Sequence, residues 1–480
     1  MTENAASTSP SPRSDPGKRG DNRLLSGAHF VPAAILAGGT VLYAMNLYFT
    51  AALMPSIVED IGGQQLFAWV ATGFLIAAVI ASTLAARSIA ALGARGAYLV
   101  GFCGFALGSA AAALSGSMEV FVASRVLQGL GGGLLAGLGY AVIRSALPQK
   151  LWLKAAALVS AMWGIGALVG PSLGGMFGEL GAWRAAYAVL AGIAILFALL
   201  SVRALPGRAA AAPEPVPYAS LAALVAAAAS LSVAPMFRTA GFDGLAVAVG
   251  VLLLVLFLAV ESRATHTVLP KLAFARGNEL KWVYALVATL CAGVMIETYV
   301  PLFGQQLGGL SPVWAGFLGA ALSLGWTGMQ LVSVKFGPRI ASSAMIGAPI
   351  LLALSMATYG LLQAPEAGGA RILAWAVALV LGGVAIGAVF PHLSVRAMGA
   401  SADAAEGEKA AAALSTTQLI AYALVSALLG VFAAGGDGDA VVTAERISLG
   451  LAVITGVGVV PGLMLLRAAR RGGRKVSLSN

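Results

Sequence analysis

The sequence predicts an all-α membrane protein of fourteen transmembrane helices: two six-helix bundles related by a pseudo-repeat, with two further helices inserted between them. Three observations lead to this prediction, namely long apolar runs, the placement of basic residues between those runs, and motifs that recur in the second half. Of the 480 residues, 59% are hydrophobic and 10% are charged, which is far more apolar than a soluble globular domain.

The apolar runs are each about 20 residues long, the length at which a helix crosses the hydrocarbon core of a bilayer. They lie near 31–55, 66–86, 97–116, 119–143, 155–178, 185–203, 217–236, 243–260, 282–304, 312–333, 341–363, 371–395, 410–433 and 446–466. The seventh and eighth runs are the least distinct, so a twelve-helix protein is the alternative.

Basic residues gather in alternate gaps between these runs. With the N-terminus placed inside, 24 of the 29 Lys and Arg residues fall in cytoplasmic segments and 4 in outer segments. The positive-inside rule predicts this bias for an even number of spans with both termini in the cytoplasm. We therefore expect a multi-pass protein of the cytoplasmic (inner) membrane, in contact with the lipid bilayer.

Motifs of the first half recur in the second half at nearly constant spacing. Asn46 corresponds to Glu297 at an offset of 251, and Arg144 to Arg396 at 252. Repeated halves around a site near the midplane are typical of secondary transporters. We expect a disordered cytoplasmic tail over 1–27, an N-terminal bundle over 28–205, an inserted pair over 206–265, a C-terminal bundle over 266–467 and a basic cytoplasmic tail over 468–480.

The fourth and fifth runs are rich in glycine. Small residues four apart let transmembrane helices approach closely, so we interpret these positions as packing or hinge residues: Gly129, Gly166, Gly170, Gly174 and Gly175. Pro171 removes one backbone hydrogen bond and is expected to bend the fifth helix, as a hinge or as a fixed shape.

The fifth-run sequence Gly166-Ala-Leu-Val-Gly170-Pro171-Ser-Leu-Gly174-Gly175 resembles the antiporter motif of the major facilitator superfamily. Within that family the chain is similar to the fourteen-helix drug:proton antiporters. Arg125-Val-Leu-Gln128-Gly129 resembles the motif whose arginine is proposed to take part in proton transfer, and Ala182-Trp183-Arg184 resembles the Trp-Arg pair that opens the sixth helix. The resemblance implies an exporter.

The chain departs from the family pattern at two places. Ala90 and Ala91 stand where the loop after the second helix carries Asp and Arg in the family, so only Gly93 and Arg95 of that motif remain. Asn46 stands where the first helix of this antiporter group usually carries an acidic residue.

Glu297 and Arg125 are the candidate proton-coupling residues. Glu297 is the only acidic residue deep within a predicted span, and an ionised carboxylate there must face a cavity, pair with a base or become protonated. Each of these suits a proton carrier, and the alternative is a hydrated structural position near the outer end. Arg125 is always charged and would regulate the carrier electrostatically, or else would bond backbone carbonyls.

Polar and aromatic residues within the predicted spans are candidates for a substrate cavity. They are Tyr43, Asn46, Thr50, Tyr140, Trp163, Gln330, Thr417, Gln418 and Tyr422. Aromatic walls with few polar groups suit lipophilic or cationic substrates. For any one of them, hydrogen bonding between helices or an interfacial position is the alternative.

Several classes of function are excluded. The sequence has no metal-ligand spacing, nucleophile motif or phosphate-binding loop, so we expect no enzyme, metal or cofactor, and its dispersed bases do not indicate nucleic-acid binding. The prediction is a monomeric, proton-coupled exporter of small lipophilic or cationic compounds that works by alternating access. The alternatives are an uptake symporter or a lipid or metabolite exporter of the same fold, and a non-transporting membrane sensor or scaffold.

Overall fold

The computed structural model describes residues 24, 29–63, 66–207, 216–233, 242–264, 267, 269–275, 278–401, 403–434 and 439–477. All regular structure in this part of the chain is helical, as the sequence predicts. The predicted N-terminal tail over 1–27 lies outside the described residues apart from residue 24, and so do the side chains of the predicted C-terminal tail from residue 469 onward.

The helices overlap the predicted runs, but the runs 282–304, 312–333 and 446–466 are each divided between two helices, and the helix of the third run begins at Ala85 instead of near 97. They are α1 (Phe30–Ile61), α2 (Phe67–Thr83), α3 (Ala85–Ala113), α4 (Met118–Ala141), α5 (Ile143–Ala146), α6 (Trp152–Glu179), α7 (Trp183–Ala204), α8 (Tyr218–Val233), α9 (Phe242–Arg263), α10 (Leu280–Val294), α11 (Val300–Gln306), α12 (Pro312–Gly319), α13 (Ala321–Ser333), α14 (Pro338–Leu361), α15 (Gly369–Met398), α16 (Ala404–Ala434), α17 (Ala440–Val457) and α18 (Val459–Ser477). The short 3₁₀ turns are η4 (Gln149–Leu151), η6 (Lys271–Ala273) and η7 (Met295–Thr298). Within the described residues, nine helices are long and apolar enough to cross a membrane, so the count of fourteen stays a prediction.

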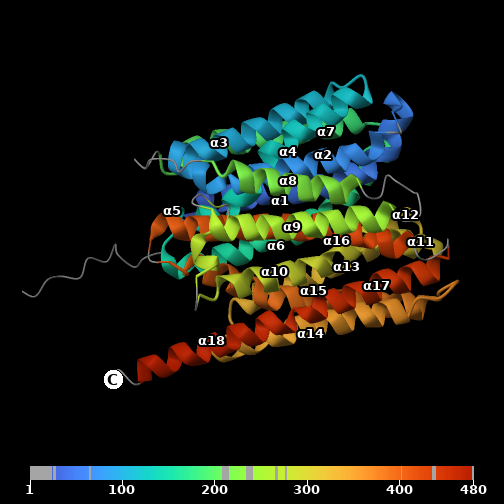
Figure 1. The fold of residues 1–480 in the computed structure, drawn as a ribbon. Helices are drawn as coiled ribbons and strands as arrows, with labels where there is room; N and C mark the ends of the chain where they lie inside the picture. The colour runs from blue at the N-terminus through green and yellow to red at the C-terminus, as the bar shows by residue number, and fades with distance from the viewer. Residues whose placement is uncertain are drawn as a thin grey trace, which may run out of the picture.

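The helices form two bundles with matching contacts. In the first half α1 packs on α6, α2 and α3 on α4, and α3 on α7. In the second half α10 packs on α16, α13 and α14 on α15, and α14 on α17. The two sets correspond one to one along the chain, as a pseudo-repeat requires. Figure 1 shows the first half in blue to green above and most of the second half in yellow to red below.

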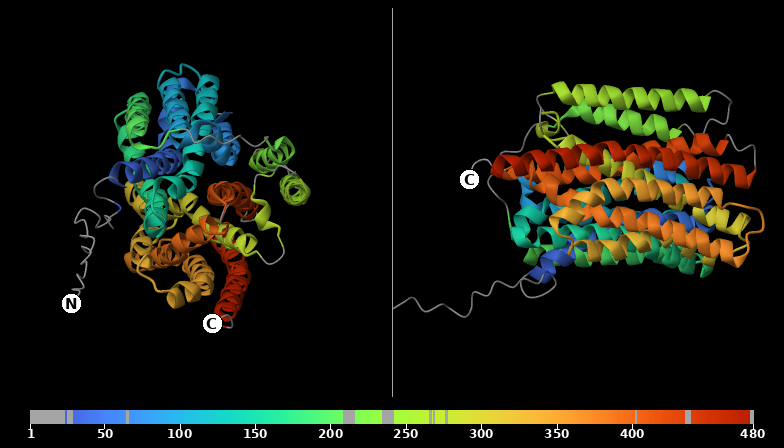
Figure 2. Two further views of the ribbon diagram at one scale, coloured as in Figure 1. Left: turned by 90° about the vertical axis from the view of Figure 1, so that its left-hand side faces the viewer. Right: turned by 90° about the horizontal axis from the view of Figure 1, so that it is seen from below.

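The inserted helices α8 and α9 stand apart from both bundles. They pack against each other and form a pair at the side of the molecule (Figure 2, left). The pair still contacts both halves, because α8 packs against α2 of the first half and α16 of the second. The halves themselves meet where α6 packs on α13 and where α4 packs on α16.

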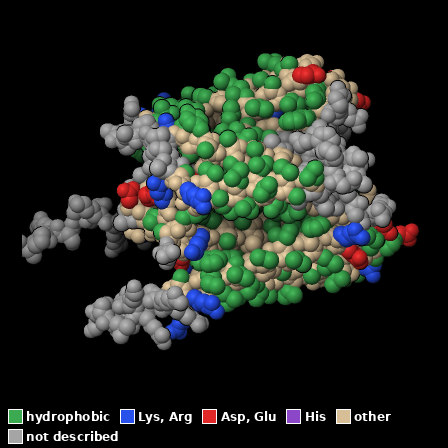
Figure 3. Space-filling model, in the orientation of Figure 1, with side chains coloured by type: hydrophobic (Ala, Val, Ile, Leu, Met, Phe, Trp, Pro, Cys, Tyr) green, Lys and Arg blue, Asp and Glu red, His purple; other side chains and the backbone are tan. Residues whose placement is uncertain are grey.

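The outer surface of the bundle is apolar. Large side chains such as Leu107, Leu252 and Val453 are 63%, 66% and 70% exposed. Figure 3 shows apolar side chains covering the middle of the face, with charged groups mostly toward its ends. Such a belt is stable only against lipid, so the protein is a multi-pass membrane protein.

Contacts between helix termini define the two ends of the bundle. Arg95 Nε, two residues after a kink at Gly93 within α3, donates to the Leu205 carbonyl after α7 at 3.1 Å. Arg396 at the end of α15 pairs with Glu279 before α10. We call this end, which also holds α5, the basic end. The opposite end holds the end of α1 and the start of α7, where Asp60 binds Arg184.

Candidate functional site

Glu297 lies at a break in a helix. The sequence predicts one span over 282–304, but the structure ends α10 at Val294, inserts the turn η7 and resumes as α11. The break follows from Pro301, which has no N–H to donate to the carbonyl of Glu297 four residues earlier and whose ring crowds that carbonyl. The interruption places an acidic side chain where the backbone is locally irregular.

The Glu297 carboxylate is buried and held by donors from both halves. The side chain is only 6% exposed. One oxygen accepts hydrogen bonds from the backbone N–H of Ser323 at 3.0 Å and from the Ser323 hydroxyl. The other accepts from the Tyr48 hydroxyl of α1 at 3.3 Å. Glu297 is therefore buried in this conformation, and it joins the two halves through Tyr48.

Arg125 lies inside the first half, on α4. Its guanidinium donates to the side-chain oxygens of Asn46 at 3.1 Å and of Gln128, and it lies over the Phe74 ring at 4.3 Å from the centroid. Gln128 is held in turn by Ser109, to which it donates at 2.7 Å. These two partners are neutral amides and not backbone carbonyls. Arg125 Nε has no hydrogen-bond partner among the described residues.

Arg125 and Glu297 do not form an ion pair. The salt bridges Arg184–Asp60 and Arg396–Glu279 involve neither of them. Both candidate coupling residues instead contact the same stretch of α1, Arg125 through Asn46 and Glu297 through Tyr48. The structure thus brings them to one helix segment without direct contact.

A chain of aromatic rings crosses from the first half to the second. The Tyr43 ring stacks on Phe74 with centroids 5.4 Å apart and meets the edge of Trp163 at 5.3 Å. Trp163 lies 5.9 Å from the ring of Tyr422 on α16. Buried polar atoms along this chain lack partners among the described residues, including Tyr43 OH, Trp163 Nε1, Tyr422 OH and both amide atoms of Gln418. Buried polar groups are normally paired, so these atoms are suited to bind water or substrate.

The remaining candidate cavity residues have different surroundings. Thr50 bonds the Tyr187 hydroxyl at 2.8 Å, and Gln330 bonds Ser160 across the halves. Thr417 donates to the Ala413 carbonyl of its own helix at 2.7 Å. Tyr140 is fully buried, 6.3 Å from the ring of Phe390. Of these, Gln330 and Tyr140 lie where the halves meet, whereas Thr50 belongs to the interior of the first half.

The glycines of α6 lie against α1. A Cβ on Gly166 would lie 2.6 Å from Met45 N, one on Gly170 would lie 2.7 Å from the Met45 carbonyl, and one on Gly174 would lie 2.7 Å from the Phe49 carbonyl. Gly129 similarly approaches the Phe74 carbonyl of α2. Gly175 differs, because a Cβ there would meet nothing within 4 Å. Pro171 is accommodated within α6, which runs unbroken from Trp152 to Glu179.

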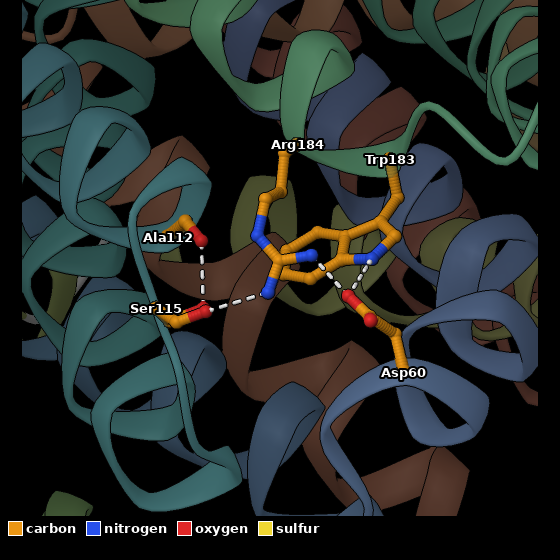
Figure 4. Close-up of polar contacts among 5 residues, drawn as sticks. All are labelled: Asp60, Ala112, Ser115, Trp183 and Arg184. Carbon is orange, nitrogen blue, oxygen red and sulfur yellow. Dashed lines mark hydrogen bonds and ion pairs between the residues drawn. The ribbon is translucent and has the colours of Figure 1, made fainter.

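The Trp-Arg pair at the start of α7 binds the end of α1 (Figure 4). Trp183 Nε1 donates to Asp60 at 3.1 Å, and Arg184 pairs with the same carboxylate while donating to the Ser115 carbonyl at 3.0 Å. These hydrogen bonds, from Arg184 first and Trp183 second, hold the pKa of Asp60 below its ordinary value. The cluster ties α1, the end of α3 and α7 together away from the basic end.

Three residues that complete these sites, Tyr48, Ser323 and Gln128, are not among the candidate site residues that the sequence predicts. The signal for Tyr48 was its place two residues after Asn46, with Tyr299 at the same offset in the second half. Ser323 is one hydroxyl in an apolar run and has no such signal. No group of three His, Cys, Asp or Glu residues that could hold a metal occurs in the described ranges.

Two helical halves that meet around a buried carboxylate, with a buried guanidinium in one of them, define the class of protein as a membrane transporter rather than an enzyme. Comparison with known proteins gives the family. A family model described as Major Facilitator Superfamily matches residues 36–434. The chain belongs to the major facilitator superfamily.

Relatives and solved structures agree with this assignment. A probable multidrug-efflux transporter of Mycobacterium tuberculosis is 40% identical over 484 aligned positions, covering 98% of this chain and 99% of the relative. The tetracenomycin C resistance and export protein of Streptomyces glaucescens is 29% identical, covering 72% of this chain and 66% of the relative. The human organic anion transporter MFSD10 has the same fold, with a TM-score of 0.66 at 17% identity, covering 90% of this chain and 98% of that chain.

Proposed function

We propose that this protein exports small lipophilic or cationic compounds in exchange for protons, by alternating access of its two halves. The observation that carries the proposal is the Glu297 carboxylate, which is buried and binds Tyr48 of one half and Ser323 of the other. A carboxylate that gains or loses a proton there changes a bond between the halves. The name of the Mycobacterium tuberculosis relative supports multidrug efflux as the direction and substrate range.

Arg125 is the proposed electrostatic regulator of this site. Its charge is permanent, and it reaches α1 through Asn46, two residues before Tyr48. The aromatic chain of Tyr43, Trp163 and Tyr422 supplies faces that favour planar and cationic compounds. We further propose a monomer in the cytoplasmic membrane with both termini inside, with the domain boundaries that the sequence predicts and with the basic end in the cytoplasm.

Transport in proteoliposomes tests the coupling assignment. In proteoliposomes that contain the purified protein and ethidium, an imposed pH gradient should drive ethidium against its concentration gradient. Glu297→Gln should abolish this proton-driven transport. The matched control is Glu366→Gln, an exposed carboxylate between α14 and α15, which should retain wild-type transport. Full proton-driven transport by Glu297→Gln would remove Glu297 from the mechanism.

Direction requires a separate measurement. Counterflow of labelled ethidium in vesicles of known orientation distinguishes an exporter from an uptake symporter. Substrate-induced proton release from the solubilised protein would argue against a non-transporting sensor or scaffold. The absence of proton release with every compound of a broad panel would favour a sensor or scaffold.

A further inference from the structure

Two arginines related by the pseudo-repeat have different partners. Arg144 follows α4, and Arg396 lies in the last turn of α15. Arg396 pairs with Glu279 at 2.8 Å, so its contact stays within the second half. Arg144 instead reaches across from the first half to the second. The repeat is therefore broken at this position, and only one of the two arginines joins the halves.

The Arg144 guanidinium binds the end of α15. Its Nη1 donates to the Met398 carbonyl at 2.8 Å and to the Ser401 carbonyl at 3.0 Å. Met398 is the last residue of α15, where helix carbonyls lack partners within the helix and carry partial negative charge. A cation is stabilised there by hydrogen bonding and by the helix dipole.

The surroundings fix the guanidinium in this position. It lies 5.6 Å from the ring centroid of Trp152 on its own half. On the other half Glu408 of α16 attracts it, and a Cβ on Gly407 would overlap Arg144 Nη1. Gly407 therefore leaves the space that the guanidinium occupies, and an added methyl group there would displace it.

Neutral hydrogen bonds also join the halves further along α16. The Ser82 hydroxyl of α2 bonds Thr416 of α16 at 3.2 Å, and Ser415 donates to the Ala136 carbonyl of α4 at 2.8 Å. In contrast, Arg95, which lies in α3 two residues after a kink at Gly93, donates to the Leu205 carbonyl of its own half. The two hydrogen bonds of Arg144 therefore place a permanent charge between the halves at the basic end.

We propose that Arg144, bound to the end of α15 and seated against Gly407, is the positioning residue that holds the basic end of the transporter closed. The inference rests on the alternating access of the proposed function, in which this end must open once per cycle. Opening separates α4 from α15 and α16 and so exchanges the two carbonyl contacts of Arg144 for water.

Cysteine labelling tests the closed state without any transport. In a Cys103→Ala, Cys291→Ala background, Thr416→Cys places a thiol at a position that is 1% exposed in this conformation. The purified full chain in nanodiscs is treated with a water-soluble maleimide. Arg144→Gln should raise the labelling rate roughly tenfold, within the range of typical coupling between sites, and Gly407→Ala should raise it in the same direction.

The control is Arg396→Gln, which removes the repeat-related arginine but no contact between the halves and should leave labelling unchanged. If Arg144→Gln does not fold, Gly407→Ala decides, because it retains the arginine and displaces only its head group. Labelling within twofold of the parent in folded Arg144→Gln and Gly407→Ala would overturn the proposal. If labelling increases but the wild-type protein transports no ethidium, the role of Arg144 at the basic end is supported and the proposed function is contradicted.

Discussion

Tyr48 and Glu297, which are 249 residues apart in the chain, are joined by a hydrogen bond of 3.3 Å between the phenol and the carboxylate. The phenol belongs to the first half and the carboxylate to the second. Two residues earlier on the same helix, Asn46 binds Arg125. α1 is thus the element on which the contacts of both candidate coupling residues converge, and it is held there by the glycines of α6.

Removing the Tyr48 hydroxyl should weaken coupling without abolishing it. In Tyr48→Phe the carboxylate keeps both Ser323 donors but loses its bond to the first half. A hydrogen bond to a charged group contributes about 1.5–3 kcal/mol, so we expect proton-driven ethidium transport to fall at least tenfold. Initial rates in proteoliposomes measure this. Tyr299→Phe, the repeat-related phenol, is the matched control and should transport normally; equal losses in both variants would contradict the role given to Tyr48.

A carboxylate at position 46 should stabilise the first half. Arg125 is 1% exposed and its described hydrogen-bond partners are neutral amides, so Asn46→Asp would give this buried charge an opposite one. We expect an increase of about 1 kcal/mol in stability, because the carboxylate would neutralise a buried guanidinium whose described partners are uncharged, less the cost of burying the carboxylate itself. Thermal unfolding in detergent measures it. The gain should disappear in Asn46→Asp combined with Arg125→Gln, and a gain that persists there would have another cause.

A methyl group at Gly170 should push α1 and α6 apart. Its Cβ would meet the Met45 carbonyl, Tyr48 Cβ and Phe49 N at 2.7, 3.1 and 3.2 Å, of which two are backbone atoms that yield only if the helix moves. Overpacking of this kind costs about 1–3 kcal/mol. Gly170→Ala should therefore melt at a lower temperature than wild type. Gly175→Ala, where a Cβ has open space, should melt as wild type does, and similar losses in both variants would indicate a general helix effect.

The Asp60 cluster should make stability depend on pH. The pKa of Asp60 is lowered by its hydrogen bonds with Arg184 and Trp183, so its stabilising contribution is fully present above the unfolded pKa of about 3.9. That contribution is lost as the pH falls through the lower pKa of the folded state. Comparing thermal unfolding of wild type and Asp60→Asn across this range should show a difference at neutral pH that vanishes in acid. A difference in unfolding temperature that grows in acid would contradict the lowered pKa of Asp60 in the folded state.

The sequence by itself determined the helical membrane fold, its repeat and the identity of the unusual residues. These follow from rules that act locally: an apolar run must be helical in lipid, a buried acid must be accommodated, and small residues permit close helix contact. Glu297, Arg125 and the stripe of Gly166, Gly170 and Gly174 were found in this way. Gly175 belongs to the same motif but not to the four-residue spacing, and a Cβ there would meet nothing within 4 Å.

The tertiary structure alone decided which residues meet. Glu297 binds Tyr48 and Ser323, and Arg125 binds Asn46 instead of Glu297. Arg144 crosses between the halves, whereas Arg396 does not. All of these contacts depend on the rotation and axial position of one helix against another. A sequence pattern predicts which face of a helix is buried, but not the axial position at which a distant helix packs on that face. Those offsets are set by side-chain packing across the whole interface.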